Sequence, residues 1–363
     1  MEMMRQQRNL LLIPFILCFI LARPVFSLNL DALLPDERNT VEVFQKASSK
    51  VVYVHRLANA TVQRRYSLQK THIPDGAGSG IIWDNKGHVV TNFHVINGAD
   101  DIAITLGNMT VPAKVIGSEP RKDIAVLEIK SPKALNYLKS FQPFEIVSLN
   151  DLIVGQKAIA IGNPFGLDHS LSKGVISALG RKVPGIGGGT IYDMIQTDTP
   201  INPGNSGGPL LNSAGQLIGM NTMIYSRSGS SAGIGFAVPA EDIQKIASQI
   251  INHGRVVLSG IGIQRVEPHL AERLGVKKGI LIADVVPGTP ADKLKLRGTH
   301  RNQWGRIVLG DVIVGVNAHP VPNYDALYNL LTEIKVGEQI TVSIIRNGKK
   351  MDVKMKTIDI AAL

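Results

Sequence analysis

The chain has 363 residues, enough for two or three domains, and its composition of 44% hydrophobic and 19% charged residues is typical of a globular protein. Its formal net charge is +10, but the basic residues are spread along the chain and no nucleic-acid-binding motif is present. The charge therefore favours solubility or attraction to an acidic membrane surface, and it argues against a nucleic-acid partner.

The first 27 residues have the layout of a secretory signal peptide. Two arginines precede the apolar run NLLLIPFILCFILA, and Val25 and Ser27 are small residues at positions −3 and −1 of a cleavage site. We therefore expect export across a membrane. The alternative is an uncleaved anchor, although the run is short for a membrane span and is interrupted by Pro14.

Residues 28–50 form an N-terminal segment in which TVEVFQKASSK, residues 40–50, has the pattern of a short amphipathic helix. From Val51 the chain consists of short runs rich in Val and Ile, such as HVVTN, IAVLEI and KAIAIG, separated by turn signals. Strands that recur roughly every eight to twelve residues, with no helices between them, predict a β-sandwich or a β-barrel.

Two stretches interrupt this strand pattern, residues 58–78 and residues 181–190. Both are predicted to be long loops, which in a compact β domain are usually functional or mobile. The β domain is predicted to span residues 51–255 and to end in the amphipathic helix AEDIQKIASQIINHG, which stops at Gly254.

A second, smaller domain is predicted for residues 259–357. It contains the strand-like runs GILIADVV, DVIVGVN and QITVSIIRN. It also contains two short helices, one with Thr289 as the capping residue before Pro290 and the other capped by Asn323.

The stretch INPGNSGGPL, residues 201–210, places Ser206 in a segment whose prolines and glycines exclude a helix. A serine nucleophile needs a base, and the base needs an orienting carboxylate. His94 follows a strand in TNFHVI, and Asp123 opens the apolar strand of DIAVLEI, where a buried carboxylate requires a partner. The order His, Asp, Ser along the chain is that of the chymotrypsin-like β-barrel proteases.

The glycines around Ser206 fit this hypothesis. Gly204 would allow its own N–H and that of Ser206 to converge as an oxyanion hole, and Gly207 and Gly208 would leave room for a substrate carbonyl. A serine in a Gly-rich turn is usually structural, but the three motifs together favour catalysis. The other histidines lack metal-ligand spacing and the single cysteine, Cys18, lies in the signal segment, so we expect neither a metal nor another cofactor.

From about residue 40 to residue 356 the sequence resembles the HtrA/Deg serine proteases. The resemblance rests on TNFHVI, DIAVLEI, AIGNPFGLDHSLSKGVIS, IQTDTPINPGNSGGPLLN, LIGMNTMI and GIGFAVPAEDI. It implies a mainly β chain, with a chymotrypsin-like double β-barrel followed by one PDZ domain, and a triad of His94, Asp123 and Ser206. It also implies an ATP-independent endopeptidase that cleaves unfolded or damaged envelope proteins in the periplasm, with chaperone activity in some members.

The resemblance assigns further residues to binding. The carboxylate-binding loop of the PDZ domain would be Gly260, Ile261, Gly262 and Ile263, with a peptide C-terminus added as a strand beside it. The substrate-binding residues would be Ile201, Asn205, Ile234 and Phe236.

Pro200 occupies the position at which proteases that cut after Lys or Arg carry an acid. We therefore predict cleavage after small or medium aliphatic residues, and Asp198 is the nearby residue that would oppose this preference. The family also implies that the loops at residues 181–190 and 225–232 switch activity. The loop at residues 58–78 is shorter than in the caged members, and only one PDZ domain is expected, so a homotrimer is favoured over a large cage.

Two alternatives to broad quality control remain open at this point. One is a narrow regulatory protease with a single membrane partner. The other is a chaperone or peptide sensor whose protease site is dormant.

Overall fold

The computed structural model describes residues 30–64, 67–166, 168–185, 189–202, 204–224 and 233–362. The predicted signal peptide, with Cys18, and the predicted switch loop at residues 225–232 lie outside the described residues. Across the described ranges, no helix has the length and apolar character that a membrane crossing requires.

The N-terminal helix is longer than the sequence pattern indicated. It is α1, Pro35–Ala47, and a 3-10 turn at Ser48–Lys50 follows it. It begins five residues early because Pro35 suits the first helical turn and the Glu37 carboxylate accepts the backbone N–H of Leu34 at 2.9 Å.

Ion pairs between Asp36 and two lysines attach helix α1 to the second barrel. Hydrogen bonds from Lys157, and then from Lys173, lower the pKa of the exposed Asp36 to about 2. Asp36 therefore keeps its negative charge, and these ion pairs, across the physiological pH range.

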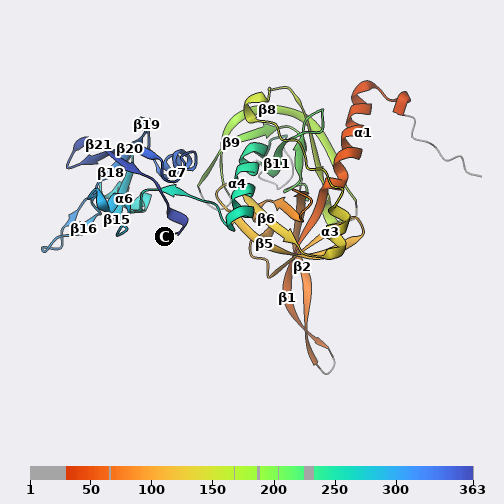
Figure 1. Ribbon diagram of the computed structural model, residues 1–363, viewed down its shortest axis with the longest axis horizontal. Helices are drawn as coiled ribbons and strands as arrows, with labels where there is room; N and C mark the ends of the chain where they lie inside the picture. The colour runs from red at the N-terminus through yellow and green to blue at the C-terminus, as the bar shows by residue number, and fades with distance from the viewer. Residues whose placement is uncertain are drawn as a thin grey trace, which may run out of the picture.

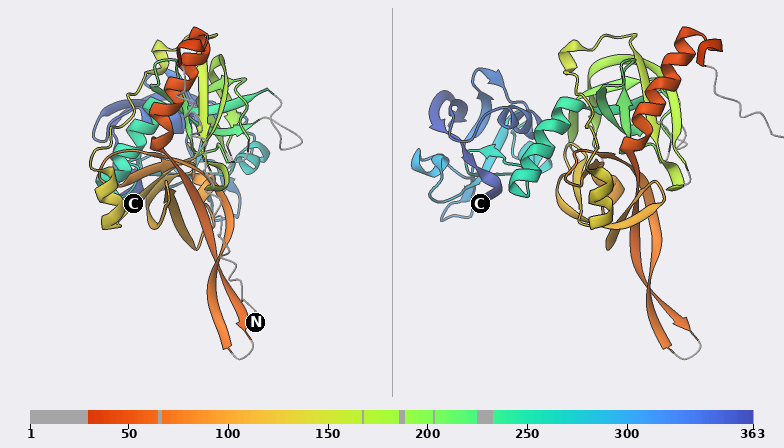
Figure 2. Two further views of the ribbon diagram at one scale, coloured as in Figure 1. Left: turned by 90° about the vertical axis from the view of Figure 1, so that its right-hand side faces the viewer. Right: turned by 45° about the vertical axis from the view of Figure 1, so that its right-hand side comes forward.

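Two closed six-stranded β-barrels follow, which confirms the predicted double-barrel fold (Figures 1 and 2). The first has the order β1-β2-β3-β6-β5-β4, and the second has the order β10-β11-β12-β9-β8-β7. The strands of the first are β1 (Val51–Arg64), β2 (Ser67–Ile82), β3 (His88–Thr91), β4 (Asp101–Leu106), β5 (Met109–Glu119) and β6 (Ile124–Ile129). Those of the second are β7 (Lys157–Gly162), β8 (Ser170–Pro184), β9 (Thr190–Thr197), β10 (Pro209–Leu211), β11 (Leu217–Ile224) and β12 (Gly235–Pro239).

The prediction of a loop at residues 58–78 is wrong. Strands β1 and β2 pair from Val51↔Ile81 out to Arg64↔Ser67, and together they form a hairpin that projects beyond the barrel in every view (Figures 1 and 2). A hairpin that leaves the barrel has no core to impose the apolar alternation from which the other strands were recognised. The second predicted loop is also partly strand, because β8 continues to Pro184 and β9 begins at Thr190.

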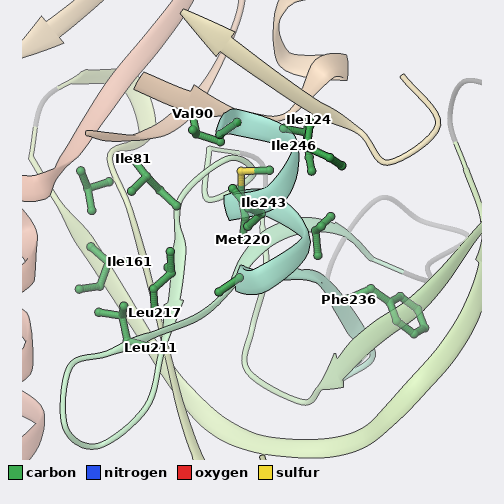
Figure 3. Close-up of a cluster of buried hydrophobic side chains, with 14 of the residues drawn as sticks. Ile81, Val90, Ile124, Ile161, Leu211, Leu217, Met220, Phe236, Ile243 and Ile246 are labelled. Atoms are coloured by element: carbon green, nitrogen blue, oxygen red, sulfur yellow. The ribbon is translucent and has the colours of Figure 1, made fainter. Parts of the chain in front are cut away.

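A shared apolar cluster fixes the two barrels to each other. It combines Ile124 of the first barrel, Met220 of the second, and Ile243 and Ile246 of helix α4 (Ala240–His253), which lie side by side in Figure 3. Burying each such side chain stabilises the fold by about 1.5–3 kcal/mol. Helix α4 ends as predicted at Gly254, whose φ of 72° is left-handed.

The C-terminal domain is built on a sheet in which the order is β14-β15-β18-β20-β21, with β19 beside β18. Its strands are β13 (Ser259–Gly260), β14 (Ile263–Arg265), β15 (Ile280–Val285), β16 (His300–Arg301), β17 (Ile307–Val308), β18 (Val312–Val316), β19 (His319–Pro320), β20 (Gln339–Arg346), β21 (Lys349–Lys356) and β22 (Ile358–Asp359). Its helices are α5 (Pro268–Arg273), α6 (Pro290–Lys293) and α7 (Tyr324–Thr332).

The two expected helices of this domain are present, but α5 was not predicted. Asn323 caps α7 as expected, because its side chain accepts the N–H of Ala326 at 2.9 Å. Thr289 precedes α6 without capping it through its side chain, since its hydroxyl donates to the carbonyl of Val286 at 2.6 Å. The short α5 has only six residues, too few to show a helical period in the sequence.

Candidate active site

His94 and Asp123 meet at one end of the first barrel. His94 lies in the short helix α2 (Phe93–Ile96) that follows β3, and Asp123 directly precedes β6. The Nδ1 atom of His94 is 2.7 Å from Oδ2 of Asp123, and the backbone N–H of His94 donates to Oδ1 at 2.9 Å. Asp123 is buried, so both of its oxygens receive a partner, as a buried carboxylate requires.

The backbone of Asp123 is held in an uncommon conformation. Its φ is 56°, in the left-handed region that costs a residue with a side chain about 1–3 kcal/mol and persists only when the surroundings enforce it. The carbonyl of Asp123 accepts the N–H of Phe93 and the Nδ2 of Asn92, each at 3.1 Å. The turn that carries the carboxylate is thus locked to the turn that carries the imidazole.

Asn92 is a site residue that the sequence analysis missed. It is fully buried, and besides Asp123 its Nδ2 donates to the Oγ1 of Thr222 on β11 at 2.7 Å. The bond crosses from the first barrel to the second. Its only sequence signal was a polar residue inside TNFHVI, since the partner lies 130 positions away.

Ser206 faces this arrangement from the second barrel. Its hydroxyl donates to the carbonyl of Thr222 at 3.2 Å, which is long for an O–H···O bond. In the part of the chain that the structure describes, no hydrogen bond joins Ser206 Oγ to His94. The structure therefore brings His94 and Asp123 together, and in it the serine hydroxyl is bonded to Thr222.

The turn around Ser206 is fixed against the first barrel through Ser79. The N–H of Ser79 donates to the carbonyl of Ser206 at 2.8 Å, and its hydroxyl donates to the carbonyl of Gly204 at 2.5 Å. Within the described ranges, nothing accepts the N–H of Ser206. That donor remains available to a substrate oxyanion.

Gly207 and Gly208 are packed closely against the backbone of neighbouring strands. A Cβ on Gly207, whose φ is 83°, would lie 2.1 Å from the carbonyl oxygen of Ser79, and one on Gly208 would lie 2.2 Å from that of Ile161. The backbones packed against these positions therefore require glycine at both.

The four predicted substrate-binding residues differ in exposure. Ile201 and Phe236 are buried in apolar clusters, with Phe236 in the cluster between the barrels (Figure 3), and Asn205 is buried where its Oδ1 accepts the Ser170 hydroxyl at 3.3 Å. Of the four, only Ile234 is exposed, at 36%.

Asp198, the residue that would oppose an aliphatic preference, is already engaged. Its Oδ1 accepts the backbone N–H of Val175 at 2.7 Å. Its carboxylate is thus used to hold the β8 backbone.

The C-terminal domain has a groove beside the predicted carboxylate loop. Gly260, Ile261, Gly262 and Ile263 line one end of it. Gly262 has a φ of 83° and is packed so closely against Thr289 that a Cβ would overlap that side chain. Much of the other wall comes from β14 and α7, through Arg265, Tyr324, Leu327, Tyr328 and Leu331, and Leu258, Ser259 and Ile360 also line the groove.

Helix α7 also contacts the protease domain. The guanidinium of Arg121 lies over the rings of Tyr324 and Tyr328, at 4.8 and 4.6 Å from their centres. Burial raises the pKa of Tyr328 far above its usual range, and the neighbouring Glu119 raises it further. Arg121 is two residues before Asp123, so the groove helix touches the turn that carries the buried carboxylate.

A second contact of α7 involves Asp325. One of its oxygens lies 3.6 Å from Arg121, and the other accepts the backbone N–H of Thr190 at 3.1 Å. Thr190 ends the stretch at residues 181–190. The same helix is therefore in contact with the groove, with the Asp123 turn and with one of the two predicted switch segments.

Comparisons with known proteins agree with this architecture. A trypsin-like peptidase domain model matches residues 78–220, and a PDZ domain model matches residues 259–357. The chain is 46% identical over 320 residues to "Protease Do-like 1, chloroplastic" of Arabidopsis thaliana, covering 88% of this chain and 71% of that protein.

Bacterial proteins and solved structures are also similar. The chain is 38% identical over 283 residues to "Probable periplasmic serine endoprotease DegP-like" of Pseudomonas fluorescens, covering 77% of this chain and 55% of that protein, and so it spans about half of that relative. The solved "HtrA-type protease AlgW with decapeptide" is 30% identical with a TM-score of 0.66, covering 88% of this chain and 98% of that one. The chain thus belongs to the HtrA/Deg family of trypsin-like serine endoproteases, with one C-terminal PDZ domain.

Proposed function

We propose that this endoprotease degrades unfolded or damaged envelope proteins without ATP, with Ser206 as nucleophile, His94 as general base and acid, and Asp123 as the orienting carboxylate. One observation carries this assignment: the two oxygens of Asp123 are bonded to Nδ1 and to the backbone N–H of the same histidine. Such a pairing fixes both the ring orientation and the tautomer.

The geometry supports a stepwise mechanism. With its proton on Nδ1, the neutral ring of His94 has its lone pair on Nε2. The Ser206 hydroxyl rotates away from Thr222, transfers its proton to Nε2 and attacks the peptide carbonyl. The N–H groups of Gly204 and Ser206 stabilise the oxyanion, and the imidazolium protonates the leaving amine. Water then repeats the sequence on the acyl-enzyme.

Substrate preference is proposed to be aliphatic. Ile201 and Phe236 would form the apolar walls of the primary pocket and Ile234 its exposed edge, while Asn205 supports the turn. This preference is consistent with the uncharged Pro200 and with an Asp198 carboxylate that is committed to the Val175 N–H.

Cleavage-site mapping by mass spectrometry on reduced, unfolded casein will test the proposal. We expect most cuts to follow Val, Ile, Leu or Ala, because a missing or misplaced apolar contact in such a pocket lowers kcat/KM by about 10–200-fold. The same protein mixed with a folded, disulfide-bonded substrate serves as the control and should yield few cuts. A map dominated by Lys or Arg before the cut would contradict the aliphatic pocket.

The PDZ groove is proposed to bind the C-terminus of a substrate or signalling peptide. The peptide would add a strand beside β14, with its carboxylate at Gly260–Ile263. The related solved structure is the HtrA-type protease AlgW with decapeptide. A peptide bound in the groove would then change the position of α7. Because α7 contacts Arg121 and the segment that ends at Thr190, this change would be passed to the catalytic turns.

Arg121→Ala tests this coupling. We expect a groove-binding peptide to raise the casein cleavage rate of the wild type about tenfold and that of the variant no more than about twofold, because typical allosteric couplings are worth 5–150-fold. Peptide affinity, measured by fluorescence anisotropy, should change little. Arg273→Ala, on the exposed face of α5, is the matched control. A variant that keeps the full peptide response would remove Arg121 from the coupling.

The assembly and compartment are proposed from the family. We propose a homotrimer or a multiple of it in the bacterial periplasm, reached through the signal peptide. The Arabidopsis relative is a chloroplastic protease, and the Pseudomonas relative is a probable periplasmic one. Intact mass together with native mass of the purified protein will measure signal removal and subunit number in one experiment.

A further inference from the structure

A small hairpin at the outer end of the PDZ domain exposes apolar side chains. Strands β16 and β17 lie at the edge of this domain that faces away from the two barrels (Figures 1 and 2). At the turn between them Trp304 is 74% exposed, the highest value among the large hydrophobic residues that the structure describes. Strand β17 adds Ile307 and Val308, which are 45% and 38% exposed, and Leu309, which follows it, is 41% exposed.

The turn is fixed in this conformation by its own hydrogen bonds. The Oδ1 of Asn302 accepts the backbone N–H of Trp304 and that of Arg306, both at 3.0 Å. The Nη1 of Arg301 donates to the carbonyl of Gly305 at 2.9 Å. Trp304 is therefore presented to solvent by an ordered turn, so binding through it would require little further ordering.

The hairpin and the segment that leads into it are basic. Residues 293–310 contain five Lys or Arg and no Asp or Glu. The carboxylate at its base, Asp311, is buried and bonded to Arg346 at 2.7 Å, so it does not offset this charge at the surface. Asp292 and Asp284 are the acids that flank the hairpin. The five basic residues are Lys293, Lys295, Arg297, Arg301 and Arg306.

We propose that this hairpin, residues 299–310, binds the surface of an anionic lipid bilayer, with Trp304 at headgroup depth and the basic side chains on lipid phosphates. Tryptophan favours this depth because its ring is apolar and its N–H is polar. Each basic residue near an anionic surface strengthens binding about fivefold. The exposed apolar side chains and the basic residues near them in the sequence are complementary in character to an anionic lipid surface, which has an apolar interior and phosphate headgroups. Bound in this way, the enzyme would keep its barrels free for substrates.

Fluorescence of Trp304 tests the proposal directly. The chain has two tryptophans, so the full-length Trp83→Phe variant reports Trp304 alone. With vesicles of phosphatidylglycerol and phosphatidylcholine in equal parts, we expect a blue shift and quenching by brominated acyl chains. Phosphatidylcholine vesicles should give little change, and salt should weaken the response. This readout reports the hairpin itself, whatever the N-terminal segment does. An unchanged spectrum with anionic vesicles, or equal changes with both vesicle types, would overturn the proposal.

Vesicle flotation of matched variants with identical N-termini, verified by intact mass, gives the second test. Trp304→Ala should weaken partitioning of the protein onto anionic vesicles about tenfold. The double variant Arg297→Gln, Arg306→Gln should weaken it about 25-fold, since each basic residue contributes about fivefold. Ile153→Ala is the apolar control, since Ile153 is 72% exposed on the protease domain. Lys349→Gln with Lys350→Gln, at the exposed start of β21, removes the same charge elsewhere and should change partitioning less.

Two outcomes would assign the hairpin another role. If Trp304→Ala lowers the native mass in the absence of lipid, the tip is a contact between copies of the chain and the lipid proposal fails. If the two charge-pair variants weaken partitioning equally, binding follows net charge and not this hairpin. Casein cleavage without lipid should be unchanged in Trp304→Ala, so this test fails or succeeds independently of the proposed protease mechanism.

Discussion

Replacing Ser206 by alanine should reduce the cleavage of unfolded casein by about 10⁶-fold, the loss typical of removing a serine nucleophile. The variant should fold normally. In the described part of the chain its hydroxyl makes one long hydrogen bond, to Thr222, and the backbone bond from Ser79 to the Ser206 carbonyl does not depend on the side chain. Losing that hydroxyl contact should lower the free energy of unfolding by about 1 kcal/mol at most.

The measurement is the appearance of casein fragments over hours, with thermal melting as the check on folding. Ser213→Ala, at an exposed turn, is the matched control and should retain full activity. The comparison also decides the dormant-site alternative. If the wild type cuts no faster than Ser206→Ala, and both suppress aggregation of an unfolding protein, the chain is a chaperone or a peptide sensor and not an active protease.

Asp123→Asn should reduce kcat by about 10⁴-fold while the fold is kept. The backbone N–H of His94 donates to Oδ1, so in the variant this position must remain the amide oxygen. The amide NH₂ is then forced to face Nδ1 of His94, where the carboxylate oxygen was. A donor at that place favours the tautomer that carries its proton on Nε2, and that ring cannot accept the proton of Ser206.

Initial rates on a quenched fluorescent peptide with an aliphatic residue before the cut will give kcat and KM separately. The change should fall on kcat, since Asp123 is buried and does not contact substrate. Asp151→Asn, at an exposed 3-10 turn, is the control. A folded Asp123→Asn enzyme within tenfold of the wild-type kcat would mean that another group orients His94.

Asn92 shows how the site depends on the contact between the barrels. It binds the carbonyl of Asp123 in one barrel and the hydroxyl of Thr222 in the other, and the carbonyl of Thr222 accepts the Ser206 hydroxyl. A displacement of one barrel relative to the other would therefore act on the carboxylate and on the serine together. Through contacts of this kind, a movement of α7 at Arg121 and Thr190 would be transmitted to Asp123 and Ser206.

Local patterns were sufficient for most of the fold. The alternating Val and Ile runs predicted the barrel strands, the isoleucine spacing and Gly254 predicted α4, and Asn323 predicted the start of α7. These signals lie within a few residues of one another. The same reasoning failed for residues 58–78, where a hairpin outside the core carries no apolar period, and for α5, which is too short to show one.

For the site, the sequence by itself determined the residue types, their order His94, Asp123, Ser206, and a turn that excludes a helix. Only the tertiary structure decided the rest. It placed the Asp123 oxygens on the imidazole and on its backbone N–H, bonded Asn92 across the two barrels, and aimed the Ser206 hydroxyl at Thr222. It also showed that Gly207 is required by the Ser79 carbonyl. The physical reason is that these bonds join residues far apart in the sequence, and the bond between Asn92 and Thr222 also joins the two barrels. Their geometry therefore exists only once the strands have paired and the barrels have packed against each other.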